Sequence, residues 1–382
     1  MKIVIAPDSW KESLSASEVA MQIEAGFRQV LPDAHYYQLP MADGGEGTVQ
    51  ALVSASQGEI ISLSVTGPLG DPVSAFYGIA GDRQTAFIEM SAASGLMHVA
   101  VDKRDPLITT SWGTGELIRH AARQGVRKII IGIGGSATND GGAGMLQALG
   151  IKLLTADQQA IPPGGAGLAA LQFIDTRGLD RQVAACQIHV ACDVTNPLLG
   201  EKGASRVFGP QKGADEQRVQ ILEHALAHYA AVIRQQLQIN VADLPGAGAA
   251  GGMGAGLLAF LPVSLRSGVE IISEALGLES AISQADLVIT GEGRLDSQSL
   301  AGKVPVGVAK LARRHGIPVI AIAGSLSENL DALYQQGIDA AFSVISRVTT
   351  LDEALLHARE NIQMTARNIA ASLVMGRKFP GQ

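Results

Sequence analysis

The sequence is poor in the features that mark several large protein classes. Only 4% of its residues are aromatic, and acidic residues outnumber basic ones by 36 to 29, for a formal net charge of −7. A protein that binds nucleic acid usually presents basic side chains to the phosphates and aromatic faces to unpaired bases. The composition therefore argues against a nucleic-acid partner, and the acidic balance also argues against an acidic membrane surface.

Long hydrophobic runs and paired cysteines are missing as well. The longest apolar segments, such as 129–133, have the length of a strand and fall far short of the roughly 18 residues that span a bilayer. The apolar run before Pro7 is too short for a secretory signal. Cys186 and Cys192 fit no C-x-x-C motif, so we expect small buried hydrophobic residues there. These features predict a cytoplasmic protein with no membrane segment.

Glycine, by contrast, is abundant. The chain has 45 glycines in 382 residues, which is well above the glycine content of about 7% in an average protein. Charged residues make up only 17% of the chain, compared with about 25% in an average protein. The glycines cluster beside Asp, Glu, Asn, Ser and Thr, between apolar segments of strand or helix length. Such clusters are typical of loops that approach a ligand closely.

The order of apolar segments predicts an α/β fold with two domains, because 382 residues exceed the roughly 250 to 300 that one core accommodates. Residues 2–6 read as a buried strand, and Ser15-x-x-Glu18 is a capping box that starts a helix. The last hundred residues alternate strand and helix patterns in the same way, with the uninterrupted apolar runs of parallel strands. Residues 60–110 instead show hairpin-like strands. We expect a parallel-sheet domain from 1–60 and 281–382, with an inserted α/β domain of mixed sheet at 61–280, and a site in the cleft between them.

Loops that follow strands are the first candidates for function, because ligands of open α/β sheets bind beyond the carboxyl ends of the strands. The loop 8–13 offers a carboxylate, hydroxyls and Lys11 just before a helix, which suits phosphate. Its alternative is a solvated turn in which Asp8 or Ser15 caps the helix. Asp43 and Glu46 in the next loop could hold Mg²⁺ through oxygen, or cap a helix as acids.

Two glycine-rich loops could hold an anion on backbone amides. The segment 128–149 reads as strand, turn and helix, and its Gly132-x-Gly134-x-x-Ala137 also resembles a dinucleotide fingerprint. The second loop, 245–256, suits either a phosphate loop or tight helix packing. The predicted cofactor-binding residues of the two loops are Gly134, Gly135, Ser136, Thr138, Asn139, Gly248, Gly251 and Gly252.

Two further loops supply acids and cations. Asp193 follows the strand-like segment IHVAC and is a candidate general base or metal ligand. The loop after the strand at 286–289 contains Glu292, Arg294, Asp296 and Lys303, and is the richest in charge, although it could also be a salt-bridged surface loop.

Together these residue types suit phosphoryl transfer. Amides and cations stabilise charge on the phosphoryl oxygens, carboxylates bind Mg²⁺, and one acid orients the acceptor hydroxyl. The P-loop pattern and the H-R-D and D-F-G signatures of protein kinases are absent from the sequence. Acyl transfer fits less well, because no Ser-His constellation stands in a motif context.

The same motifs resemble the glycerate kinase family of the bacterial, 2-phosphoglycerate-forming type. The resemblance spans residues 6–306, with Trp10 and Ser299 where the family more often has Phe and Thr. It is carried, in order, by APDSWKESLSA, MADGGEGT, GIGGSATNDGGAGMLQALG, ACDVTNPLLG, FGPQKGA, PGAGAAGGMGAG and GEGRLDSQSLAGKVP.

The resemblance implies a Rossmann-like domain with an inserted α/β domain. It also implies ATP- and Mg²⁺-dependent phosphorylation of (R)-glycerate in glyoxylate or aldarate breakdown, and is compatible with a homo-oligomer. As hypotheses, Lys11, Arg294 and Lys303 bind phosphate or the glycerate carboxylate; Asp43, Glu46 and Asp296 serve Mg²⁺; and Asp193 or Asp296 orients the acceptor hydroxyl. The competing interpretations are an NAD-dependent oxidoreductase of a small hydroxy acid and a non-catalytic small-acid sensor.

Overall fold

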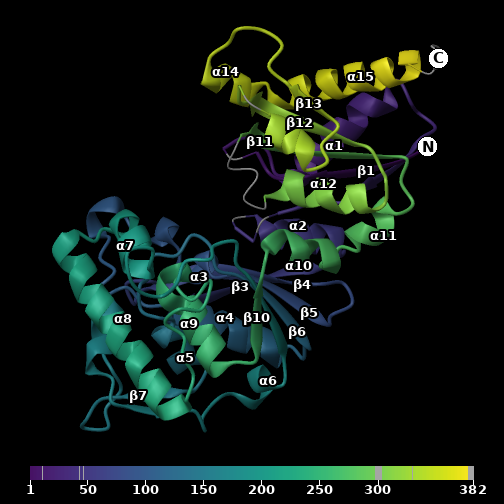
Figure 1. Cartoon of the computed structure of the whole chain (residues 1–382). Helices are drawn as coiled ribbons and strands as arrows, with labels where there is room; N and C mark the ends of the chain where they lie inside the picture. The colour runs from purple at the N-terminus through teal and green to yellow at the C-terminus, as the bar shows by residue number, and fades with distance from the viewer. Residues whose placement is uncertain (11, 43, 46, 297–302, 329, 377–382) are drawn as a thin grey trace. The chain divides into compact units, whose positions relative to one another are not determined.

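The computed structural model describes residues 1–382 except 11, 43, 46, 297–302, 329 and 377–382, and is drawn in Figure 1. The chain forms two compact units. Unit 1 comprises residues 1–43 and 269–382, and unit 2 comprises residues 44–268.

Unit 1 contains a five-stranded sheet in the order β13-β12-β11-β1-β2, in which every neighbouring pair is parallel. Buried apolar runs in the central strands explain this arrangement, because helices cover both faces of a parallel sheet. The strands are β1 (Lys2–Pro7), β2 (His35–Gln38), β11 (Leu287–Leu295), β12 (Val319–Leu326) and β13 (Ala340–Ser343).

Helices α1 (Ala16–Arg28) and α15 (Ala358–Gly376) pack against one face of this sheet and share its core with Ile3, Ile5 and Ile289. A β-carbon on Gly26 of α1 would collide with the backbone of α15, so glycine permits the close approach. Helix α12 (Val304–Arg314) packs on β11 and β1. The remaining helices of this part are α10 (Gly268–Ala275), α11 (Leu278–Ile282), α13 (Asp331–Gln335) and α14 (Leu351–Leu356).

Unit 2 contains a six-stranded mixed sheet in the order β10-β9-β6-β5-β4-β3. Strands β5, β6, β9 and β10 are parallel, whereas β3, β4 and β5 are joined as antiparallel neighbours. These strands are β3 (Glu59–Thr66), β4 (Pro72–Ile79), β5 (Thr85–Glu89), β6 (Lys128–Gly132), β9 (Gln187–Ala191) and β10 (Val263–Arg266), and a separate pair consists of β7 (Lys152–Leu154) and β8 (Phe173–Asp175).

The core of unit 2 lies between this sheet and α4, α5, α8 and α9. Helix α2 packs on β4 and β5. The helices are α2 (Thr48–Ala55), α3 (Ser91–Ser94), α4 (Trp112–Arg123), α5 (Ala143–Ala148), α6 (Arg181–Ala184), α7 (Ala204–Phe208), α8 (Glu216–Leu237) and α9 (Ala249–Phe260), with short 3-10 helices at Leu96–His98, Val101–Lys103, Gly165–Ala170 and Pro210–Lys212.

The predicted fold class is confirmed: a parallel sheet built from both ends of the chain and a mixed sheet from its middle. The units divide after residues 43 and 268, whereas the sequence analysis placed the limits near 60 and 280. The difference arises at α2, because Val49 and Val53 of this helix pack beside Gly78 of β4. Both ends of unit 2 lie together, since a β-carbon on Gly44 would lie 3.7 Å from the Cα of Gly268.

Across the part of the chain that the structure describes, no helix is both long enough and apolar enough to cross a membrane. Both cysteines are free thiols. Cys186 is buried and Cys192 is partly buried, and burial raises the pKa of each thiol. This agrees with the interpretation of the two residues as small hydrophobic side chains.

Candidate functional site

In unit 1, the first and the last sequence motifs meet because β1 and β11 are adjacent parallel strands. The amide of Asp8, just after β1, donates a hydrogen bond to the carbonyl oxygen of Gly291 at 2.8 Å. Ser15 caps α1, and its hydroxyl and Glu18 form the predicted capping box. Asp8 therefore does not cap this helix; its carboxylate accepts from the amide of Ser9 at 2.7 Å.

These loops line a cavity of about 820 Å³ within unit 1. Its polar wall combines carboxylates, a hydroxyl and two cations at the carboxyl ends of β1 and β11, the edge where α/β sheets bind ligands. The side chains of this wall include Asp8, Ser9, Glu12, Glu292, Arg294, Asp296 and Lys303.

The charges of the polar wall are paired across short distances. The ammonium of Lys303 lies 3.3 Å from the carboxylate of Glu292, which is nearly buried. The Nε of Arg294 lies 3.3 Å from the carboxylate of Asp296, and the Arg294 side chain is 70% exposed. An anionic ligand that brings its own divalent cation would match both signs of charge in this wall.

In unit 2, three other motifs meet beyond β6 and β9. A β-carbon on Gly132, at the end of β6, would collide with the carbonyl oxygen of Gly44. A β-carbon on Gly44 would lie 2.8 Å from that of Ala191, at the end of β9. Glycine is required because the backbone of Gly44 rests directly on the two strand ends.

Two carboxylates stand at this edge of unit 2. The carboxylate of Asp193, an exposed residue, accepts from the amide of Gly268 at 3.0 Å. The carboxylate of Glu89 is 3% exposed and accepts from the amide of Val49 in the first turn of α2, at 2.8 Å. Sequence reasoning missed Glu89, although the same signal that selected Asp193, an acid at the end of an apolar strand, also applies to it.

The hydrogen bonds of Asp140, a fully buried residue of the loop after β6, fix the conformation of this loop. Its carboxylate accepts from the amide and the hydroxyl of Ser111, both at 2.8 Å, and from the amides of Gly142 and Gly144 at 3.1 and 3.2 Å. Burial raises the pKa of Asp140, and these hydrogen bonds oppose the rise. Of the predicted cofactor-binding residues in this loop, Gly134 and Gly135 are exposed.

Lys212 is a second residue that sequence reasoning did not select. Its side chain is 1% exposed, and its ammonium donates to Ser136 Oγ at 2.8 Å and to the carbonyl oxygen of Thr138 at 2.6 Å. Burial lowers the pKa of Lys212 to about 7, opposed by the charge of Asp140. The buried side chain of Asn139 in turn donates to Ser205 Oγ at 3.1 Å.

The second glycine-rich loop packs closely against the first. Gly248, Gly251 and Gly252 are buried, and a β-carbon on Gly251 would collide with the carbonyl oxygen of Thr138. Ala250, Gly251 and Gly252 all adopt left-handed backbone conformations inside α9. The loop is thus tightly packed, and its role as a phosphate loop stays a prediction.

The predicted site residues fall into three groups. Arg294, Asp296 and Lys303 lie in the cavity of unit 1. Asp193 and the glycine-rich loops lie in unit 2. The predictions for Lys11, Asp43 and Glu46 fall outside the described residues. Within the described ranges, no group of three or more His, Cys, Asp or Glu side chains has the arrangement of a metal site.

Comparison with known proteins places this chain among phosphotransferases. The model of the glycerate kinase family matches residues 3–374. The chain is 59% identical to "Glycerate 2-kinase" of Escherichia coli (strain K12), with all of both chains covered, and 55% identical to "Glycerate kinase" of Bacillus subtilis (strain 168), with 99% of each covered. The crystal structure of putative glycerate kinase 2 from Salmonella typhimurium LT2 superposes with a TM-score of 0.92, at 60% identity, over 99% of this chain and 100% of that one. The chain belongs to the glycerate kinase family.

Proposed function

We propose that the protein transfers the γ-phosphoryl group of ATP to the 2-hydroxyl of (R)-glycerate, forming 2-phosphoglycerate and ADP. The observation that carries this proposal is the cavity of unit 1, where Lys303 and Arg294 stand among carboxylates at the strand ends. Membership of the glycerate kinase family supplies the acceptor and implies ATP as the donor.

In this reaction the glycerate oxygen bonds to the γ-phosphorus as the bond to the β,γ-bridging oxygen breaks. The hydroxyl proton leaves to a carboxylate, and charge spreads over the phosphoryl oxygens. Lys303 and Arg294, with Lys11, would stabilise that charge or bind the glycerate carboxylate. Asp193 or Asp296 would orient the acceptor hydroxyl and accept its proton.

Asp8, Glu292 and Asp296 line the cavity and offer carboxylate oxygens, which Mg²⁺ prefers, but the described acids do not form a complete metal site by themselves. Mg²⁺ would take its remaining ligands from the donor's phosphates and from water. When bound, the ion would neutralise charge on the phosphates. Asp43 and Glu46 remain predicted contributors.

The glycine-rich loop of unit 2 is our proposed anion nest. Its exposed glycines, Gly134 and Gly135, would offer backbone amides to phosphate. Gly135 has a positive φ of 71°, a left-handed conformation of the kind found in anion nests and one that a side chain would disfavour. Ser136, Thr138, Asn139, Gly248, Gly251 and Gly252 are buried and would act by holding the loop in shape.

The test is ADP release measured with and without (R)-glycerate, followed by phosphorus NMR of the product. We expect glycerate-dependent ADP formation and a phosphorus signal coupled to the C2 proton. An ADP formation rate that is the same with and without glycerate would overturn the proposal. A 3-phosphoglycerate product would overturn the proposed transfer to the 2-hydroxyl.

Titration with NADH, followed by nicotinamide fluorescence, tests the oxidoreductase alternative at Gly132-x-Gly134-x-x-Ala137. A small-acid sensor would bind glycerate without forming ADP.

Three further expectations stay predictions: a site in the cleft between the domains, a cytoplasmic location, and a homo-oligomeric state. A role in glyoxylate or aldarate breakdown likewise depends on the proposed reaction.

A further inference from the structure

One wall of the cavity in unit 1 has no task in the chemistry proposed so far. It is built from the first motif and from residues 344–358, which run from the end of β13 to the first residue of α15 and also contribute Thr349 and Thr350 to the lining. The apolar residues of this wall are Trp10, Val344, Ile345, Leu351, Ala354, Leu355 and Ala358.

Leu351 is the informative member of the apolar wall. Its side chain lines the cavity and yet is 71% exposed, so it does not serve the core of unit 1. A large apolar side chain that lines a cavity can contact a ligand bound there, because ligand pockets are lined mainly by apolar side chains. Leu356, on the same helix α14, is 76% exposed but does not line the cavity.

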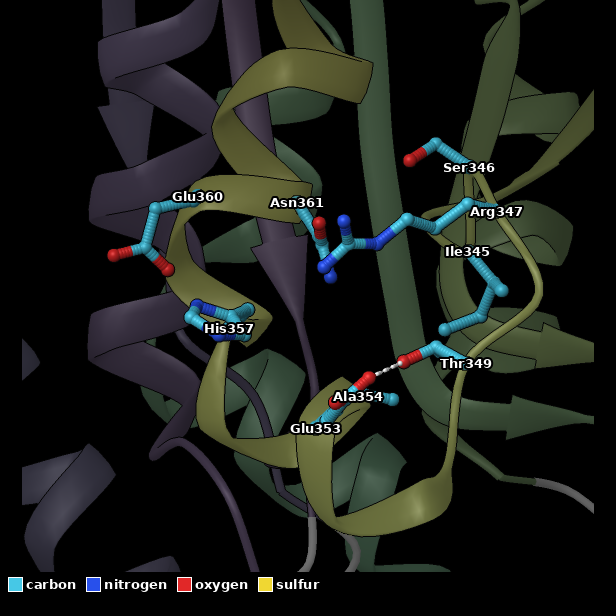
Figure 2. Close-up of a pocket in the computed structure, with 9 residues that line it drawn as sticks. All are labelled: Ile345, Ser346, Arg347, Thr349, Glu353, Ala354, His357, Glu360 and Asn361. Carbon is cyan, nitrogen blue, oxygen red and sulfur yellow. Dashed lines mark hydrogen bonds between the residues drawn. The ribbon is translucent and has the colours of Figure 1, made fainter.

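The apolar wall is held in place by polar contacts around α14. Thr350 caps the helix by accepting from the amide of Glu353 at 3.3 Å. Thr349 Oγ1 donates to the carboxylate of Glu353 at 2.6 Å, as Figure 2 shows. Ser13 Oγ donates to the carbonyl oxygen of Leu355 at 3.3 Å, which ties α14 to the first motif. The wall is therefore a preformed surface.

A second pocket adjoins this wall and differs from it in chemistry. It measures about 250 Å³ and shares Ile345, Thr349 and Ala354 with the larger cavity. Figure 2 shows the guanidinium of Arg347 directed towards Asn361, with most of the other drawn side chains also polar. Because Ile345 is the main apolar side chain in it, this pocket does not offer an apolar surface for a ring.

Glycerate does not account for the apolar wall, because each of its three carbons carries oxygen. A nucleotide does, because a purine base has two apolar faces and its phosphates carry negative charge. The cavity joins an apolar wall to a wall containing Lys303 and Arg294, and its volume lies in the range of pockets that enclose small organic ligands.

We propose that the purine base of the phosphate donor binds against the apolar wall, with Leu351 covering it, while the phosphates extend towards Lys303. This assignment rests on the proposed kinase function and adds the location of the donor's base. It gives residues 344–358 a role in donor recognition, although they lie outside the seven motifs.

The test compares Leu351→Ala with the matched control Leu356→Ala. Both changes remove the same exposed side chain from one helix, so folding should be preserved in each. We expect Leu351→Ala to weaken ADP binding, measured by calorimetry, and to raise KM for ATP, each about tenfold. KM for glycerate and the affinity for inorganic tripolyphosphate should change less than about twofold, because neither ligand has a base.

Trp10 provides a second readout, since it belongs to the apolar wall and Trp112 is the other tryptophan of the chain. In a Trp112→Phe background, ADP should change Trp10 fluorescence, with an apparent Kd that Leu351→Ala raises. Equal ADP affinities of Leu351→Ala and Leu356→Ala, or equal losses for ADP and tripolyphosphate, would overturn the assignment. ADP binding needs no turnover, so this result is separate from a failure of the glycerate reaction.

Discussion

The ammonium of Lys212 lies 2.6 Å from the carbonyl oxygen of Thr138, in the interior of unit 2. Lys212 ends a short 3-10 helix, and Thr138 belongs to the glycine-rich loop after β6. The buried side chain of Lys212 thus joins two of the sequence motifs and fixes the loop whose exposed glycines we propose as an anion nest.

Replacing Lys212 with Met should loosen this loop. Ser136 Oγ and the Thr138 carbonyl would lose their donor inside the protein, which costs about 1–3 kcal/mol per unsatisfied group. We expect faster hydrogen exchange of the amides in 134–142 and a kcat/KM at least about tenfold lower, because a nest must be preorganised. Lys202→Met, at an exposed lysine of the same unit, is the control. Unchanged exchange in 134–142 would show that Lys212 does not hold the loop.

The stability of the protein should depend on pH because of Lys212. Burial lowers the pKa of Lys212 to about 7 from its ordinary value of 10.5. Between these values the unfolded chain binds a proton that the folded chain does not, so stability rises with pH across this range and is flat below it. The unfolding free energy of the wild type should therefore rise relative to that of Lys212→Met by up to about 1.4 kcal/mol per pH unit from pH 7 to 9.5. Urea denaturation at several pH values measures this difference, and a flat or falling difference would contradict it.

The two candidate acids can be tested as a pair. Asp193→Asn and Asp296→Asn each keep the side-chain shape but remove the negative charge, so each should lower kcat at least about a hundredfold. Asparagine can still accept from the amide of Gly268, which preserves that contact of Asp193. Asp71→Asn, at an exposed position, should have no effect. Near-normal turnover of both variants would refute the proposed roles.

The packing of the two glycine-rich loops gives a stability prediction. Gly251→Ala places a β-carbon against the Thr138 carbonyl at a φ of 66°, so it should destabilise unit 2 by at least about 3 kcal/mol. Gly125→Ala has a comparable backbone strain, with a φ of 86°, but no atom within 4 Å, and should cost only about 1 kcal/mol. Unfolding in urea compares the two variants. Equal losses would mean that backbone conformation alone, and not contact between the loops, sets the cost.

Much of the fold can be predicted from the sequence because strands and helix ends are marked by patterns of neighbouring residues. Apolar runs such as residues 2–6 indicate buried parallel strands, and Ser15 with Glu18 marks a helix start. The limits of the two units are harder to predict from the sequence. The local pattern of helix α2 does not show which sheet it covers, and its packing on β4 and β5, with Val53 beside Gly78, assigns it to unit 2.

Part of the candidate site can also be predicted from local sequence patterns. Arg294, Asp296 and Lys303 lie within ten residues of one another, which predicts that they meet in one cavity, although the strand β11 continues to Leu295 and so contains Glu292 and Arg294, which the sequence analysis placed in a loop. The burial of Lys212 against Thr138 joins residues 74 positions apart, and no local pattern records it. Leu351 was missed because an isolated exposed leucine carries no signal until a cavity is found beside it.

The adjacency of Gly44 and Gly268 has a consequence for how this polypeptide can be taken apart. Because the first and last residues of unit 2 lie next to each other, we expect residues 44–268 to be separable from the rest of the chain as one block. The excised block can equally be closed head to tail. Since unit 2 has its own sheet and its own core, we expect this block to fold as a separate polypeptide.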